Sequence, residues 1–234
     1  MQPTFVLVHS PLVGPSTWSL VADELGRQEL ETLVPTLGNE NPSLPYWEQH
    51  ATEVVEALNV ISQDVPLILV GHSGAGPLLP AIQQLAKRNV VGYIFVDAGI
   101  PLDGRSQLDL MALESPEFAE QFRESLQSGE RFPTWSDEDL QDIIPDETFR
   151  HRIMNELQPR SLDYFNERMP VFEGWPDAPR AYIQFTSTYD VFADRARTEG
   201  WVFHRMEGGH FHMLVDPEGV TTVLLDFARN MLDQ

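Results

Sequence analysis

One serine of this chain lies among small residues in a pattern typical of nucleophilic catalysis. An apolar run at residues 67–70 leads directly into Gly71-His72-Ser73-Gly74-Ala75. A strand, a sharp turn with a serine at its apex and a following helix form a nucleophile elbow, which projects the serine hydroxyl into a cleft. The usual pattern is G-x-S-x-G, and Ala75 is still small enough for a tight turn. The pattern therefore predicts Ser73 as a nucleophile.

A serine hydroxyl needs a base to remove its proton, and that base is commonly a histidine oriented by a carboxylate. Near the end of the chain, residues 207–212 read Glu-Gly-Gly-His-Phe-His. The two glycines would let this loop reach back over the edge of a sheet. We therefore expect His210 to be the base, with His212 as the rival.

The carboxylate should come from a strand end. Asp190 follows an expected strand at residues 181–186 and lies between Ser73 and His210 in the chain. That order makes Asp190 the expected acid. Asp97 ends another apolar run, at residues 90–96, and is the alternative.

These residues need a scaffold that brings strand ends together. Strands are expected in six short apolar or β-branched runs, at residues 4–8, 32–34, 67–70, 90–96, 181–186 and 202–206. Segments with helical spacing separate most of these runs, which predicts an α/β fold with a doubly wound, mostly parallel sheet. Sites in such sheets lie at the carboxyl ends of the strands.

The pattern changes between residues 101 and 179, where we find amphipathic helical segments and no convincing strand. We expect residues 1–100 and 180–234 to form the core, with residues 101–179 inserted as a helical cap over the cleft. Cap side chains should line the substrate pocket, and the candidates are Trp135, His151 and Trp175.

The chain resembles the α/β-hydrolase fold family, most closely its small, capped esterase and hydroxynitrile-lyase branch. The resemblance rests on the elbow at residues 71–75, on Val8-His9-Ser10 near the start and on Gly209-His210 near the end. It implies an α/β-hydrolase fold in which Ser73, an aspartate and His210 form a catalytic triad.

The resemblance also implies an oxyanion hole, in which backbone N–H groups stabilise the charge that develops on the substrate oxygen. The Gly74 N–H would be one donor. The family's first loop usually reads His-Gly-X, with the N–H of X as the second donor. Here the loop reads His9-Ser10-Pro11, and proline has no N–H. The Ser10 hydroxyl or the Leu12 N–H would have to replace it.

Composition limits the partners and the compartment. The 234 residues carry a formal net charge of −21, which argues against nucleic acids and anionic membranes. No apolar run approaches the roughly 20 residues that span a bilayer, and no signal peptide is evident. The chain contains no cysteine, and its histidines lack the clustered partners of a metal site. We expect a cytoplasmic protein without cofactor or metal that could form a homodimer.

Together these features predict a serine hydrolase that cleaves a small ester, lactone or thioester through an acyl-Ser73 intermediate. Two alternatives remain open at this point. Ser73 and His210 could instead act as general acid and base in a lyase or a cofactor-free elimination. The fold could also serve as a ligand-binding protein without turnover.

Overall fold

A parallel sheet forms the centre of the computed structural model, which describes residues 2–38 and 43–233. The sheet has six strands in the order β2-β1-β3-β4-β5-β6, and every neighbouring pair is parallel. The strands are β1 (Thr4–Val8), β2 (Thr32–Leu33), β3 (Leu67–His72), β4 (Val90–Val96), β5 (Arg180–Gln184) and β6 (Val202–Arg205). His72 pairs with Val96, so β3 and β4 end at the same edge of the sheet.

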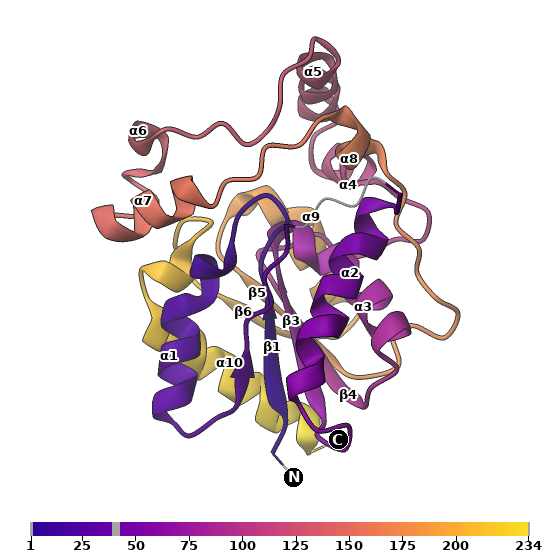
Figure 1. The fold of residues 1–234 in the computed structure, drawn as a ribbon, viewed down its shortest axis with the longest axis vertical. Coiled ribbons are helices and arrows are strands. Elements are labelled where there is room, and N and C mark those ends of the chain that lie inside the picture. The colour runs from indigo at the N-terminus through magenta and orange to yellow at the C-terminus, as the bar shows by residue number, and fades with distance from the viewer. Residues whose placement is uncertain (1, 39–42, 234) are drawn as a thin grey trace.

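Helices cover both faces of this sheet, as expected for a doubly wound α/β fold (Figure 1). One face packs against α1 (Ser19–Arg27) and α10 (Pro217–Leu232). The opposite face packs against α2 (Tyr46–Ala57), α3 (Leu79–Ala86) and α9 (Asp190–Thr198). The 3₁₀ helices are η1 (Pro15–Trp18), η2 (Leu58–Val60), η3 (Ser73–Leu78), η4 (Ser187–Tyr189) and η5 (His212–Leu214).

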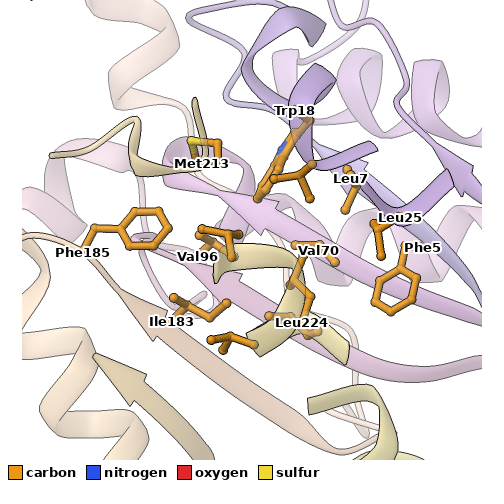
Figure 2. Packing of buried hydrophobic residues seen from close by; sticks show 14 of the residues in the cluster. Phe5, Leu7, Trp18, Leu25, Val70, Val96, Ile183, Phe185, Met213 and Leu224 are labelled. Atoms are coloured by element: carbon orange, nitrogen blue, oxygen red, sulfur yellow. The ribbon is translucent and has the colours of Figure 1, made fainter. Parts of the chain in front are cut away.

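The alternation of side chains along each strand explains this two-sided packing. In β1, Phe5 and Leu7 point into the core shared with α1 and α10, whereas Val6 and Val8 point into the core on the other face. Figure 2 shows the first of these cores, where Leu224 of α10 packs near the strand residues. Because both faces are buried, the strands read as continuous apolar runs, which is why the sequence reveals them.

The segment between β4 and β5 holds a group of helices at one end of the molecule, beyond the carboxyl ends of the strands (Figure 1). These helices are α4 (Gln107–Glu114), α5 (Pro116–Gln127), α6 (Asp137–Leu140), α7 (Glu147–Asn155) and α8 (Leu162–Asn166). None of the helices in the described part of the chain is long and apolar enough to cross a membrane. Residues 2–38 and 43–233 likewise contain no cluster of three or more metal-ligating side chains.

A close backbone contact joins the helix after the elbow to the chain that follows β4. A Cβ atom added at Gly76 would lie 2.4 Å from the backbone oxygen of Gly99 and 2.9 Å from the Cβ of Ala98. Real Cβ atoms do not come this close to other atoms, so only glycine at position 76 lets η3 pack against this segment. The contact therefore couples the position of Ser73 to the end of β4.

We predict that Gly76→Ala destabilises the protein by about 1–3 kcal/mol, because the added methyl group must push backbone atoms apart. Gly26→Ala in α1 is the matched control, since nothing lies within 4 Å of its added Cβ. That variant should be unchanged or more stable by up to about 1 kcal/mol, because alanine favours a helix over glycine. Urea unfolding of both variants measures the difference, and equal stabilities would contradict the account.

Candidate active site

The elbow holds Ser73 in a strained backbone conformation at the carboxyl end of β3. The φ angle of Ser73 is +56°, in the left-handed region that residues other than glycine rarely adopt. The turn is crowded, because a Cβ added at Gly71 would lie 3.1 Å from the Ala75 oxygen. Strain of this kind persists where the surrounding structure enforces it, and it is common at functional sites.

Ser73 lines a cavity of about 650 Å³ that lies between the edge of the sheet and the helical segment after β4. This volume lies within the range of small-molecule sites. Residues from the strand ends and from the helical segment both line the cavity, and they include Ser10, Leu12, Ser73, Gly74, Gln107, Glu114, Phe132, Trp135, Tyr164, Tyr189 and His210. Most of its surface is apolar and aromatic. Among these lining residues Glu114 is a carboxylate, and none is Lys or Arg.

His210 is held by a buried aspartate. The Nδ1 atom of His210 lies 2.7 Å from Oδ2 of Asp97, whose side chain is fully buried. A carboxylate can only accept, so the proton on Nδ1 is fixed there and Nε2 keeps its lone pair. Asp97 also accepts from the backbone N–H groups of Phe185 and Thr186, at 2.9 Å each, and from the Thr186 hydroxyl. This network orients the imidazole with Nε2 free to accept a proton.

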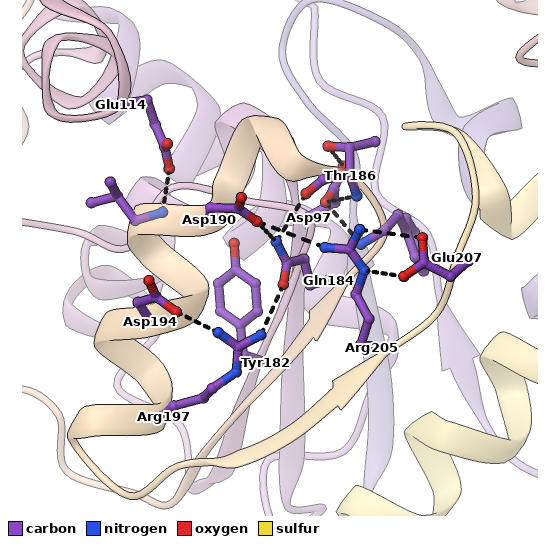
Figure 3. Close-up of polar contacts among 12 residues, drawn as sticks. Asp97, Glu114, Tyr182, Gln184, Thr186, Asp190, Asp194, Arg197, Arg205 and Glu207 are labelled. Atoms are coloured by element: carbon purple, nitrogen blue, oxygen red, sulfur yellow. Dashed lines mark hydrogen bonds and ion pairs between the residues drawn. The ribbon is translucent and has the colours of Figure 1, made fainter.

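The expectation that Asp190 orients His210 is wrong. Asp190 is the first residue of α9 rather than part of a loop, and its side chain is 60% exposed. Figure 3 shows it turned toward Gln184, which donates to it at 2.6 Å, and toward Arg205 at 3.8 Å. A negative charge at the start of a helix is stabilised by the free N–H groups there. The alternative, Asp97, occupies the position beside His210.

Three other sequence candidates lie away from the cavity. His151 is 58% exposed in α7, where its nearest charged partners are Asp137 and Glu147. Trp175 packs its ring edge-on against Tyr93, in the core on the face of the sheet that α2, α3 and α9 cover. His212 packs against Phe185, and neither it nor the other two lines the cavity. The position of a residue in the chain does not show whether its side chain faces the cavity, so the sequence could not exclude these three residues. Trp135 does line the cavity.

The loop after β1 contains a turn that accounts for Pro11. The Val13 N–H donates to the Ser10 oxygen at 3.1 Å, which closes a β-turn with Pro11 at the second position, where proline is favoured. The Leu12 N–H points at the Ser10 hydroxyl oxygen, 3.4 Å away. That hydroxyl oxygen lies 3.2 Å from where a Gly74 Cβ would be. Ser10, Leu12 and Gly74 therefore come together beside Ser73.

The hydroxyl of Ser73 lies 3.3 Å from the hydroxyl of Tyr189, at hydrogen-bond distance. No hydrogen bond joins Ser73 to His210 within the described residues, although both line the same cavity. In ligand-free enzymes such bonds are often long and tighten only when substrate binds. Sequence reasoning missed Tyr189, although it directly precedes Asp190. It also missed Gln107, whose side-chain amide donates to the Gly74 oxygen at 3.1 Å.

Two buried histidines support the site in their neutral forms. His72 Nε2 donates to the His210 oxygen at 2.9 Å, and burial holds the pKa of His72 well below its usual value. His9 Nδ1 donates to the Ser10 oxygen, while its Nε2 accepts from the Leu37 N–H. Burial lowers the pKa of His9 to about 4. Each ring thus fixes a loop of the site through its hydrogen bonds.

We predict that His9 titrates near pH 4 and stays neutral from pH 5 to 8, as measured by the imidazole resonances in NMR spectra. Because the unfolded chain takes up these protons near pH 6.5, the stability from His9 and His72 is complete above that pH. Between about pH 6.5 and 4, each histidine should lower the free energy of unfolding by about 1.4 kcal/mol for every unit by which the pH falls. A His9 midpoint near 6.5 would contradict this arrangement.

Several solved structures share the fold of this chain. An extracellular alpha/beta-hydrolase from a Paenibacillus species has a TM-score of 0.75 at 20% identity, with 96% of this chain and 98% of that chain covered. Polyneuridine aldehyde esterase has a TM-score of 0.74 at 17% identity and 97% and 100% coverage. A pyrethroid hydrolase from Sphingobium faniae JZ-2 has a TM-score of 0.72 at 16% identity and full coverage of both chains. At these identities the likeness shows the fold.

Comparison with curated protein sequences gave no significant match. The model of the alpha/beta hydrolase family, however, matches residues 5–223, which include the elbow, Asp97 and His210. The chain belongs to the alpha/beta hydrolase family.

Proposed function

We propose that the protein is a serine hydrolase that cleaves a small ester, lactone or thioester through an acyl-enzyme on Ser73. The observation that carries this proposal is the 2.7 Å bond between His210 and the buried Asp97, in the same cavity as the strained Ser73. This bond leaves His210 Nε2 free to act as the base. Asp97, and not Asp190, is the acid of the proposed triad.

In the proposed reaction Ser73 Oγ attacks the substrate carbonyl carbon while its proton passes to His210 Nε2. The carbonyl oxygen becomes negative and accepts hydrogen bonds from the N–H groups of Gly74 and Leu12 and from the Ser10 hydroxyl. The bond to the leaving group then breaks, and His210 returns the proton to the departing atom. A water molecule activated by His210 releases the acyl group and restores Ser73.

The lining of the cavity favours an uncharged, apolar substrate. Its aromatic side chains can bury apolar groups of a substrate, and none of the described residues that line it is a Lys or Arg that could pair with an anion. Glu114 adds a carboxylate at the wall, where it accepts from the Val191 N–H at 2.8 Å. Burial raises the pKa of Glu114 above its usual value. We propose that residues 101–179, which supply five of the eight Phe, Tyr and Trp side chains lining the cavity, act as a cap over the site.

A lyase without an acyl-enzyme would be favoured if Pro11, which has no N–H, left the oxyanion loop without a second donor. The turn geometry argues against this, because the Leu12 N–H lies 3.4 Å from the Ser10 hydroxyl oxygen, which itself lies beside Gly74, and can serve as that donor. The hydrolase proposal needs no group that the site lacks.

Reaction with a fluorophosphonate probe tests the proposal. An activated serine attacks the phosphorus and expels fluoride, so we expect the intact mass to rise by one phosphonyl group located on Ser73. Ser73→Ala should show no adduct. Ser128→Ala is the matched control, because Ser128 is an exposed residue that caps the end of α5, and it should label like the wild type.

Two results would contradict the proposal. One is a folded wild-type protein that gains no adduct. The other is an adduct that persists on Ser73→Ala, which would mean that a different side chain is the reactive nucleophile.

A further inference from the structure

Among residues 2–38 and 43–233, Tyr189 is the hydrogen-bond partner of the Ser73 hydroxyl, and it has no part in the proposed triad. It ends η4, the short helix that follows β5, and lies directly before α9. Its hydroxyl is 3.3 Å from Ser73 Oγ. Its ring stacks on the His210 imidazole, with ring centroids 5.5 Å apart and planes inclined by 11°. The phenol is therefore fixed relative to both the nucleophile and the base.

The position of Tyr189 separates it from the proposed oxyanion donors. The three heavy atoms nearest to the place of a Gly74 Cβ belong to Ser10, Gln107 and Tyr164. Tyr189 instead packs beside His210 and Phe192. In the proposed reaction His210 must deliver its proton to the leaving group, so the departing atom has to lie on the His210 side of Ser73. The Tyr189 hydroxyl lies 3.3 Å from Ser73 Oγ, on a ring stacked against His210, and we therefore place it on that side.

The protonation state of Tyr189 defines what it can do there. Burial raises its pKa above the usual value, so the phenol keeps its proton and cannot serve as a base. A neutral phenol has a single proton to donate. Before reaction that proton can go to Ser73 Oγ, which leaves the serine proton free for His210. Once Oγ is bonded to carbon it becomes a poorer acceptor, and the phenol proton can turn to a neighbouring oxygen.

We propose that Tyr189 donates a hydrogen bond to the leaving-group oxygen, and that the substrate is accordingly an alkyl ester or a lactone. This inference rests on the hydrolase function proposed above. As the tetrahedral intermediate collapses, the bond between carbon and the leaving oxygen breaks and that oxygen takes the electron pair. It receives its proton from His210 Nε2 while it accepts the hydrogen bond from Tyr189. The phenol itself neither gains nor loses a proton.

The substrate class follows from the chemistry of the leaving atom. An alkoxide is strongly basic and accepts hydrogen bonds strongly, so a fixed phenol stabilises its departure. A phenolate leaving group disperses its charge and needs little help, and sulfur is a weak acceptor. A tyrosine in this place therefore serves alkyl esters and lactones more than thioesters.

Tyr189→Phe tests the proposal with two substrates that share one acyl group, ethyl butyrate and 4-nitrophenyl butyrate. Phenylalanine keeps the stack on His210 and removes only the hydroxyl. We expect kcat/KM for the ethyl ester to fall by about 10- to 100-fold, the range for a lost hydrogen bond to a charged oxygen. The 4-nitrophenyl ester should lose less than about threefold, since its leaving group does not need the bond.

The matched control is Tyr93→Phe, because the Tyr93 hydroxyl bonds to Asp177 outside the cavity. It should hydrolyse both esters like the wild type. A purely structural role for Tyr189 would slow both esters equally, and an equal loss or no loss would overturn the proposal. Fluorophosphonate labelling separates the failures. If Ser73 labels but the wild type does not cleave ethyl butyrate, the substrate class is wrong, and if Ser73 does not label, the hydrolase function itself fails.

Discussion

The buried carboxylate of Asp97 is the constraint on which the arrangement of the site depends. An ionised carboxylate without solvent is stable only when its oxygens accept enough hydrogen bonds. Here one oxygen accepts two backbone N–H groups, from Phe185 and Thr186, and the other accepts the Thr186 hydroxyl and His210. These partners come from the chain after β5 and from the loop after β6, whereas Asp97 directly follows β4. One side chain thus ties three strand ends together.

Backbone strain accompanies this arrangement. Ser73 and Asp97 directly follow the adjacent parallel strands β3 and β4, and both have positive φ angles, +56° and +43°. Neutral His72 donates a hydrogen bond to the backbone oxygen of His210 and so fixes the loop that carries His210. The helix η3 packs against the chain after β4 through Gly76. The rigid sheet therefore holds the proposed reactive groups, while the segment between β4 and β5 supplies part of the apolar wall of the cavity. This division of labour is typical of sites on α/β sheets.

Much of the fold could be predicted because buried parallel strands are continuous apolar runs and because the elbow requires small residues. The acid could not be assigned from chain order, since a strand end and a helix start look alike when only one aspartate is considered. A local signal was nevertheless present, because Phe192, Ala193 and Ala196 are spaced as the buried face of a helix that begins at Asp190.

The cavity lining was less predictable. Trp135 and Trp175 belong to the same helical segment and have the same side chain, yet one faces the cavity and the other packs on Tyr93. Such a difference depends on how helices and loops pack in three dimensions, which no local pattern records. Tyr189 is a similar case, since its importance comes from a contact with Ser73, which is distant in the chain.

The most direct test of the account compares Asp97→Asn with Asp190→Asn, the same isosteric change at the two competing positions. The readout is kcat for hydrolysis of a butyrate ester, with thermal unfolding to verify that both variants fold. We expect Asp97→Asn to lower kcat by about 10³- to 10⁴-fold, because the amide no longer holds His210 in the productive tautomer. Asp190→Asn should stay within about threefold of the wild type. A large loss at Asp190, or an unaffected Asp97 variant, would contradict the central claim.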